Sequence, residues 1–116
     1  MSNPDFDIVR AVWREKDWPG VEEGLSYGTE ALKVRGKLLV RWREPGVIVL
    51  RCDLDEKEFL MMANPDVFFE TDHYKGWPAV LARIELIDPE ELAKMIEKTW
   101  RGAATKKMIA DFDARR

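Results

Sequence analysis

The stretch TDHYKGWP at residues 71–78 contains the side chains best suited to chemistry in this 116-residue chain. Its His73 is the single histidine of the chain, and Tyr74, Lys75 and Trp77 follow within four residues. Histidine exchanges protons near neutral pH, and tyrosine or tryptophan rings stack on nucleic-acid bases and other flat ligands. The segment can therefore be a catalytic loop, a binding loop or a shaped turn.

These three interpretations make different demands on residues 71–78. In a shaped turn, Tyr74 and Trp77 cover the core and His73 bonds a backbone carbonyl group. In a binding loop, the segment presents its polar and aromatic side chains to a partner: Asp72, His73, Tyr74, Lys75 and Trp77. In a small-ligand site or an enzyme, His73 and Tyr74 act together with Arg83. The composition favours the shaped turn first, the binding loop second and catalysis last, because a lone histidine in a polar loop is more often a hydrogen-bonding residue than a base.

Other catalytic and metal-binding chemistry finds little support. Cys52, the single cysteine, is expected in the middle of a strand on its apolar face, where burial raises the thiol pKa and makes it inert. A structural zinc site needs four ligands, usually cysteine and histidine, and the chain has one of each. The seven glycines form no phosphate-binding pattern. We expect no enzyme activity, no metal and no cofactor.

Alternating apolar residues predict strands within residues 31–53. Leu38, Val40 and Trp42 then share the face that packs on the core. Glu44–Gly46 is typical of a three-residue hairpin loop, with Gly46 at a positive φ. The loop sets a register whose cross-strand pairs are Trp42 with Ile48, Val40 with Leu50, and Leu38 with Cys52.

The opposite face of these strands is expected to be basic. Residues 31–51 carry six basic residues against one acidic residue, a net charge of +5, whereas the whole chain has −3. The six are Lys33, Arg35, Lys37, Arg41, Arg43 and Arg51, with Leu39, Val47 and Val49 between them. Arginine forks match phosphate oxygens, so this face can contact DNA. The other interpretation, which the sequence favours, is an ordinary solvated face whose apolar residues are covered by the stems of long charged side chains. Six phosphate contacts give a slope of about −5 in log K against log salt, so the binding is expected to be weak, salt-sensitive and mostly non-specific.

The remaining elements are predicted from caps and spacing. Asn3-Pro4-Asp5 begins a helix, and residues 21–30 are expected to be an irregular acidic connector. Asp53 or Asp55 caps a second helix, whose apolar body is Phe59 to Met62, and Asn64-Pro65 ends it. A short strand over 67–69 and a longer one over 79–86, with Leu86 facing inward, precede a helix that begins at Asp88-Pro89. Gly102 ends that helix, and Met108, Ile109 and Phe112 mark a last one.

This order of elements predicts an α+β fold with helices packed on one face of an antiparallel sheet. The length suits a single domain over residues 1–116. One cysteine fits a reducing compartment, the N-terminus lacks a signal-peptide core, and no apolar run reaches the length of a membrane span. We therefore expect a cytoplasmic protein that does not enter a membrane.

The ordered stretches of the chain resemble the MmcQ/YjbR family of small bacterial proteins. The resemblance rests on PGVEEGLSYG at 19–28, ALKVRGKLL at 31–39, NPDVFFETDHYKGWPAVLAR at 64–83, DPEEL at 88–92 and ATKKMI at 104–109. It implies a CyaY-like α+β fold whose β-hairpins are described as a double wing, and a DNA-binding role, but no catalytic residues. The alternative left open is a protein-interaction or regulatory domain whose partner meets residues 72–77.

Overall fold

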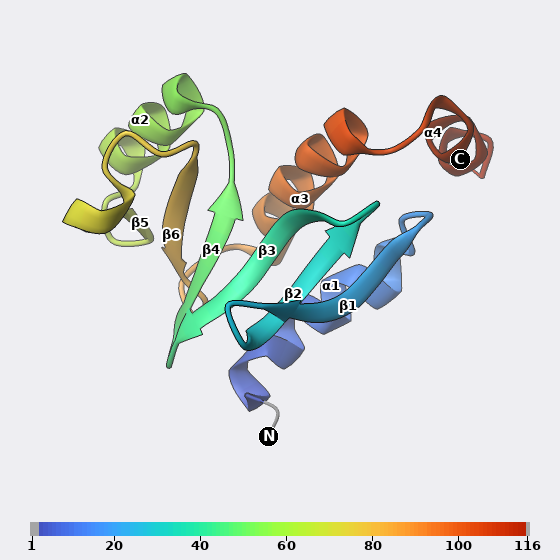
Figure 1. The fold of residues 1–116 in the computed structure, drawn as a ribbon. Helices are drawn as coiled ribbons and strands as arrows, with labels where there is room; N and C mark the ends of the chain where they lie inside the picture. Colours follow the sequence, from blue (N-terminus) through green and yellow to red (C-terminus); the bar gives the residue numbers. More distant parts are fainter. Residues whose placement is uncertain (1–2, 116) are drawn as a thin grey trace.

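The computed structural model describes residues 3–115 and shows an α+β fold (Figure 1). Two 3-10 turns and four α-helices accompany six strands in this part of the chain. The elements in chain order are η1 Pro4–Phe6, α1 Asp7–Lys16, β1 Val21–Ser26, β2 Thr29–Val34, β3 Lys37–Glu44, β4 Val47–Arg51, α2 Leu54–Ala63, β5 Phe68–Phe69, η2 Asp72–Tyr74, β6 Ala79–Arg83, α3 Pro89–Ala103 and α4 Lys106–Asp113. Within residues 3–115, none of the helices is both long enough and apolar enough to cross a lipid bilayer.

The strands form one antiparallel sheet in the order β1-β2-β3-β4-β6-β5. The expectation of an irregular connector at 21–30 was wrong, because these residues form β1, the turn after it and the start of β2. Tyr27 and Gly28 both have positive φ, 53° and 78°, as a two-residue hairpin of the primed type requires. Arg35 and Gly36 repeat this geometry at the predicted second turn. Four consecutive strands therefore form a meander.

Helices α1 and α3 lie behind the meander in Figure 1, on one face of the sheet. Helix α2 lies at the edge of the sheet formed by β6 and β5 and contacts both strands. The front face of the sheet in this view carries no helix. We call it the outer face, and the face packed on α1 and α3 the core face.

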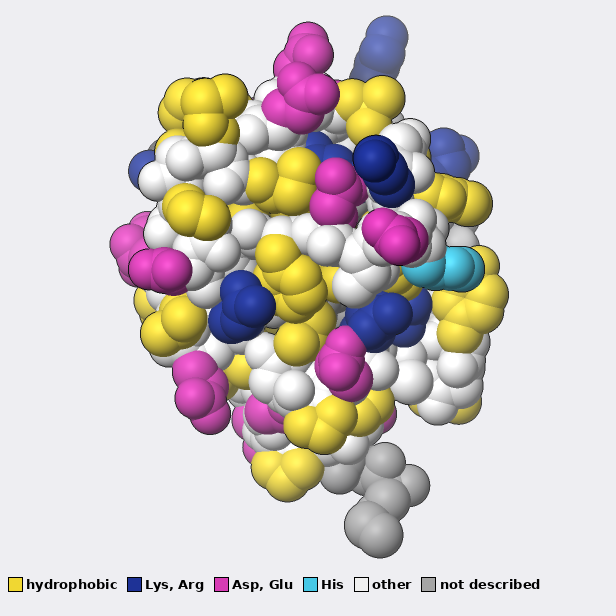
Figure 2. Space-filling model, turned by 90° about the vertical axis from the view of Figure 1, so that its left-hand side faces the viewer, with side chains coloured by type: hydrophobic (Ala, Val, Ile, Leu, Met, Phe, Trp, Pro, Cys, Tyr) yellow, Lys and Arg dark blue, Asp and Glu magenta, His cyan; other side chains and the backbone are white. Residues whose placement is uncertain are grey.

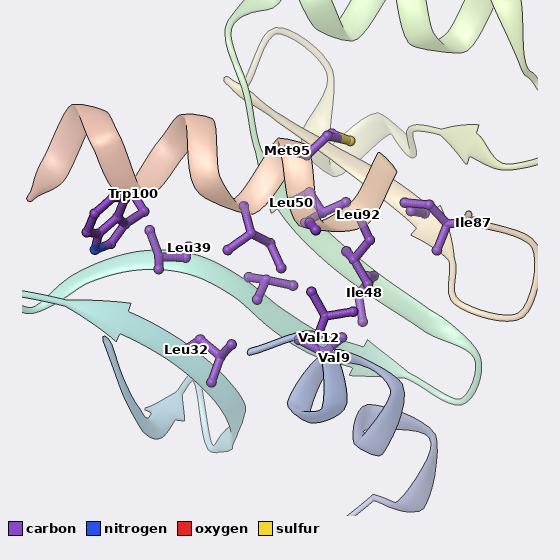
Figure 3. Packing of buried hydrophobic residues seen from close by; sticks show 14 of the residues in the cluster. Val9, Val12, Leu32, Leu39, Ile48, Leu50, Ile87, Leu92, Met95 and Trp100 are labelled. Atoms are coloured by element: carbon purple, nitrogen blue, oxygen red, sulfur yellow. The ribbon is translucent and has the colours of Figure 1, made fainter. Parts of the chain in front are cut away.

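The core lies between the sheet and the helices α1 and α3 (Figure 3). Side chains of α1 and α3 meet those of the central strands there, with Leu92 and Trp100 from α3 and Leu39 and Ile48 from β3 and β4 all fully buried. Trp18 is also buried, and its indole donates a hydrogen bond to Glu97 at 3.1 Å. The indole of Trp100 donates to the Pro19 carbonyl at 2.9 Å. Each buried tryptophan thus has a partner for its N–H group.

A β-bulge in β3 changes which residues face the core. Leu32 of β2 pairs with Val40, whereas Lys33 pairs with Leu38, so Leu39 is an extra residue in β3. Leu39 and Val40 are both fully buried in the core cluster. Two consecutive residues on one face are a usual result of such a bulge, and strict alternation therefore failed here. Leu38 lies on the outer face instead of the core face.

The predicted hairpin between β3 and β4 is confirmed. Trp42 pairs with Ile48 and Val40 with Leu50, and Gly46 has a φ of 77°. Arg43 is the extra residue before the turn, because Glu44 pairs with Val47. The expected pair of Leu38 with Cys52 does not form within this ladder, since β4 ends at Arg51.

The predicted caps of α2 and α3 are confirmed, but the inward placement of Phe59, Met62 and Leu86 was wrong. Asp53 accepts a hydrogen bond from the Glu56 amide at 2.7 Å, and Asp88 accepts one from Glu90 at 3.1 Å. Phe59 and Met62 of α2 are exposed, because α2 covers only the narrow edge of the sheet and buries one side. Leu86 is also exposed, since β6 ends at Arg83 before reaching it. Gly102 lies inside α3, which continues to Ala103.

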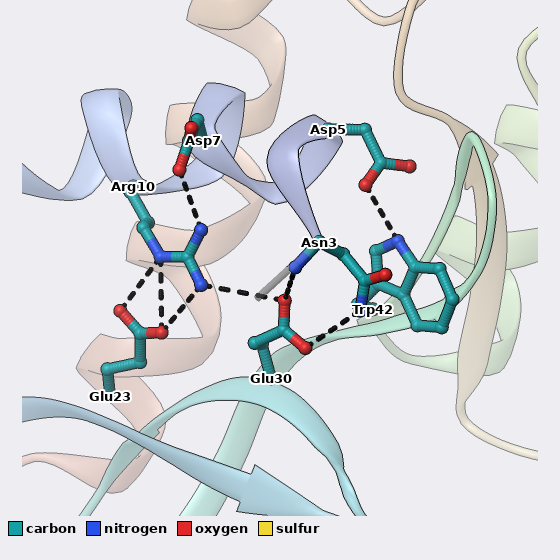
Figure 4. A network of polar contacts seen from close by, with 7 residues as sticks. All are labelled: Asn3, Asp5, Asp7, Arg10, Glu23, Glu30 and Trp42. Atoms are coloured by element: carbon teal, nitrogen blue, oxygen red, sulfur yellow. Dashed lines mark hydrogen bonds and ion pairs between the residues drawn. The ribbon is translucent and has the colours of Figure 1, made fainter. Parts of the chain in front are cut away.

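The N-terminal segment is tied to the sheet by a polar network (Figure 4). Asn3 does not cap a helix with its side chain; its amide groups donate to Glu30 of β2 at 2.6 and 2.8 Å. Arg10 of α1 donates to Glu23 at 2.8 Å and to Asp7 at 2.7 Å, and its guanidinium lies 3.6 Å from Glu30. The network joins the first helix to β1 and β2.

Glu30 makes this network sensitive to acid. Burial acts to raise the pKa of Glu30, but the hydrogen bonds from Asn3 and from its own backbone, with the charge of Arg10, hold the pKa below its ordinary 4.5. A carboxylate with a depressed folded-state pKa stabilises the fold above its unfolded-state pKa, and the contribution is lost as pH falls through the folded-state value. We expect Glu30→Gln to lose less stability than the wild-type protein between about pH 5 and pH 3 in urea denaturation. The matched control is Glu15→Gln, an exposed residue of α1; an identical acid response of Glu30→Gln and wild type would refute the assignment.

Candidate functional site

A hollow of about 380 Å³ opens on the outer face of the sheet. Strands β3, β4 and β6 supply its floor, the turn after β1 supplies one wall, and η2 with the following loop supplies the other. The lining residues are Tyr27, Leu38, Arg41, Val49, Arg51, His73, Tyr74, Trp77 and Ala79. The hollow therefore brings part of the predicted basic face together with part of the predicted loop.

Arginine and aromatic side chains alternate across this site. The Arg41 guanidinium lies 5.3 Å from the Tyr27 ring centroid and donates a hydrogen bond to the Tyr74 hydroxyl. Arg43 lies over the other tyrosine, 5.5 Å from the Tyr74 centroid. Cations over aromatic faces are attracted by the ring quadrupole. Arg41 thus links both walls of the hollow.

Arg51 differs from the other two arginines at the site. It pairs in the sheet with Ala79 and is exposed. Its guanidinium makes no hydrogen bond or ion pair with any residue between 3 and 115, whereas Arg41 bonds Tyr74 and Arg43 bonds Glu44. Arg51 therefore keeps its full set of donors for a ligand at the rim of the hollow.

The loop that forms one wall is held from below by Lys57 of α2. Its side chain is 3% exposed, and its Nζ donates to the carbonyls of Tyr74 at 2.6 Å and Trp77 at 3.0 Å. The Glu70 carboxylate forms an ion pair with the same Nζ at 2.9 Å. The sequence analysis missed this residue, although its position three residues before buried Leu60 places it on the inward side of the helix.

The 71–78 segment has only part of the geometry predicted for a shaped turn. Tyr74 is half-buried and packs on a small apolar cluster of Val49, Ala79 and Leu81, as expected for a shaped turn. Trp77 is 58% exposed and does not cover the core. His73 is exposed, and its ring contacts the Tyr74 ring edge-on at 5.3 Å. Figure 2 shows the histidine, in cyan, at the surface among hydrophobic and charged side chains.

The rest of this segment projects outward. Asp72 and Lys75 are exposed on either side of the lining residues. Neither of them lines the hollow.

The six predicted basic residues are not all on the outer face. Arg41, Arg43 and Arg51 are there, and so is Lys33, whose Nζ donates to the Leu25 carbonyl. The placement of Arg35 and Lys37 was wrong. Arg35 donates to the carbonyl of Ala103 in α3 at 3.2 Å. Lys37 pairs with the core residue Val34 and lies beside the end of α3, because the bulge in β3 reverses the alternation before it.

The structure does not bring the residues considered for catalysis close to one another. Arg83 lies away from His73 and Tyr74, where it donates to the Asp66 carbonyl at 3.1 Å and lies 4.2 Å over the Phe69 ring. Cys52 follows β4 and is half-buried against the core, and burial raises its pKa to about 11. Among the described residues, no group of three or more potential ligands is arranged to hold a metal ion.

Comparison with known proteins identifies the family of the chain. The family model described as YjbR matches residues 16–102. This chain belongs to the YjbR family. The YjbR match includes the whole meander, the loop that holds the hollow's second wall, and nearly all of α3.

Relatives of the YjbR chain include two mycobacterial proteins whose names describe them as uncharacterized. Mb2600 of Mycobacterium bovis and Rv2570 of Mycobacterium tuberculosis are each 31% identical to it over 67 residues. The overlap is 57% of this chain and 52% of each relative, so the chain spans about half the length of the curated relatives it matches.

One solved structure has the same fold over nearly the full length of this YjbR chain. The crystal structure of Deinococcus radiodurans protein DR2400, whose domain is designated DUF419, aligns with a TM-score of 0.70. The alignment covers 97% of this chain and 92% of that one at 18% identity. At this identity the likeness concerns the fold, and function has to be argued from the site.

Proposed function

We propose that this YjbR-family chain is a non-enzymatic domain that binds DNA weakly through the outer face of its sheet. One observation carries the proposal: Arg41, Arg43 and Arg51 lie on a helix-free face and alternate there with aromatic rings. Guanidinium groups suit phosphate oxygens, and aromatic rings suit bases. The free thiol at Cys52 fits the reducing cytoplasm as the place of action.

The size of the basic cluster limits the affinity. With three arginines at the site, the slope of log K against log salt for a duplex is about −2.7. Between 50 and 200 mM salt the affinity then falls roughly 40-fold. The net charge of −3 for the whole chain adds long-range repulsion. Weak, salt-sensitive and mostly non-specific binding follows.

The test is fluorescence anisotropy of a labelled duplex of about 20 base pairs at about 50 and 200 mM salt. We expect saturable binding at the lower salt that weakens steeply at the higher salt. Arg51→Ala should weaken binding and reduce the salt slope by about one, because one phosphate contact is lost. The Arg51 side chain has no hydrogen-bond or ion-pair partner among residues 3–115, and the substitution keeps the backbone carbonyl that accepts from Thr99, so folding should be unchanged.

Arg14→Ala provides the matched control. Arg14 is an exposed arginine of α1, which lies on the core face of the sheet. This variant changes the net charge by the same amount but removes no group from the outer face. Equal losses for Arg14→Ala and Arg51→Ala, or no binding by folded protein at the lower salt, would refute the proposal.

A protein-binding role is the second candidate, and the exposure of Trp77 favours it. Tryptophan is enriched at the energetic centres of protein interfaces, and this side chain is 58% exposed at the loop. If a protein partner uses the loop, Trp77→Ala should abolish its binding with little dependence on salt. Arg51→Ala should then have no effect, in contrast to DNA binding.

A further inference from the structure

The hollow on the outer face has the dimensions of a site for one small flat group. Its volume of about 380 Å³ is at the lower end of the range for small-molecule sites, about 300–1,000 Å³. Leu38, Val49 and Ala79 supply an apolar floor. Two aromatic side chains project beside it, with Tyr27 91% exposed and Trp77 58% exposed. A flat apolar group inserted here would meet aliphatic side chains below and rings at its sides.

A duplex cannot use such a hollow well. Its bases are stacked on one another inside the helix, so an inserted base has to leave the stack and loses its pairing and stacking there. A base in a single strand is already available for stacking on protein side chains. Its neighbouring phosphate would meet Arg51, the arginine at the rim that has no partner among residues 3–115.

We propose that the hollow takes one unstacked base of a single-stranded nucleic acid, with the adjacent phosphate at Arg51. The inference rests on the proposed function and specifies its ligand: the domain prefers single strands to duplexes, and the preference comes from the base.

The walls are fixed before a ligand arrives. Arg41 holds both tyrosines, through its position over the Tyr27 ring and its hydrogen bond to the Tyr74 hydroxyl. Lys57 anchors the carbonyls of Tyr74 and Trp77. Tyr27 itself occupies a tight turn of positive φ, so its backbone is constrained. The groups that are already held in place lose less entropy when a ligand binds.

The experiment compares four ligands by anisotropy and competition at the same salt concentration. They are a labelled oligothymidylate of about 12 nucleotides, an abasic strand of equal length, a duplex, and thymidine monophosphate as competitor. We expect the oligothymidylate to bind more tightly than the duplex and at least about tenfold more tightly than the abasic strand, which retains the phosphates but not the bases. The monophosphate should displace the strand poorly, because it lacks the neighbouring phosphates.

Two variants test the walls. Tyr27→Asn removes the ring and suits the turn, because asparagine tolerates positive φ. It should weaken oligothymidylate binding roughly tenfold and weaken abasic-strand binding much less, because the abasic strand has no base to stack on the ring. Trp77→Ala should have the same signature and does not depend on the turn.

The outcomes separate the two proposals. Equal binding of the abasic strand and the oligothymidylate would overturn the base site, and so would unchanged oligothymidylate affinity in both variants.

If duplex binding still fell with salt and with Arg51→Ala, the proposed function would stand without the base site. Strong displacement by the monophosphate would make the occupant a free nucleotide and overturn the single-strand assignment. Absence of binding to any of the nucleic acids would overturn both proposals.

Discussion

Replacing Lys57 by methionine should lower the free energy of unfolding by about 3 kcal/mol. The side chain is 3% exposed and is surrounded by one carboxylate and two loop carbonyls. Removing one partner of a buried ion pair leaves the other charge without compensation, which is more costly than losing an exposed pair. Here Glu70 loses its cation, and the carbonyls of Tyr74 and Trp77 lose their donor.

The same substitution should damage the hollow. The two carbonyls belong to residues that form one of its walls, so their release frees the loop. We expect Lys57→Met to weaken oligothymidylate binding even under conditions where the protein is fully folded, whereas Arg14→Ala does not. Urea denaturation followed by circular dichroism gives the stability change, and anisotropy gives the binding change.

Lys98→Met is the matched control for Lys57. Lys98 also forms ion pairs with acidic residues, Asp53 at 3.8 Å and Glu56 at 3.5 Å, but its side chain is 62% exposed. Exposed pairs contribute about 0–1 kcal/mol. The double variant Lys57→Met/Glu70→Met should recover part of the lost stability, because it leaves no unpaired carboxylate. A Lys57→Met protein as stable as Lys98→Met would contradict the role assigned to Lys57.

Arg10→Met should be the second strongly destabilising change, also by about 3 kcal/mol. The Arg10 side chain is 7% exposed and lies among Asp7, Glu23 and Glu30. Its hydrogen bonds with Glu23 raise its pKa above the ordinary value, against the opposing effect of burial. Without the guanidinium, three carboxylates remain close together and Glu30 remains buried.

Arg10→Lys separates charge from geometry. Lysine keeps the positive charge but cannot reproduce the forked donors that reach Glu23 and Asp7 together. We expect a stability between those of wild type and Arg10→Met in urea denaturation. Lys107→Met removes an exposed pair with Asp111 and should change stability by about 0.5 kcal/mol or less. Equal stabilities of Arg10→Met and Lys107→Met would show that the network does not stabilise the fold.

Much of the fold follows from local sequence signals. The caps at Asp53 and Asp88 and the turn at Gly46 depend on residue types that satisfy backbone groups or permit positive φ, and the structure confirms them. The pair of Trp42 with Ile48 follows from the loop length and from matching apolar faces. The α+β arrangement follows from the order of these elements.

The remaining errors have a common physical origin, because each depends on contacts distant in sequence. Strand β1 lies at the edge of the sheet and exposes most of its side chains, so it lacks the alternation of a half-buried strand. The burial of Lys57 depends on the position of the loop that it binds. Phe59 and Met62 are exposed because α2 lies at the sheet's end.

The sequence predicted several residues of the candidate site, but not that the fold brings them together. The arginines of β3 and β4 and the aromatic residues of the loop were both recognised, as separate surfaces. Tyr27 was not considered, although Gly28 beside it is the residue type that permits the positive φ of a tight turn. It completes the hollow only because the first hairpin lies across the sheet from the loop, and that proximity is a property of the whole topology.

The bulge at Leu39 affects how residues of the candidate site can be matched to residues of other family members. Before it, Leu38 belongs to the outer face; after it, Arg41 does, so the two are separated by an odd number of positions. An alignment that gains or loses one residue in β3 exchanges core positions with hollow positions along the rest of the strand. At 18% identity, as with DR2400, sequence matching does not fix such a shift. Residue correspondence in this strand should therefore be taken from superposed backbones.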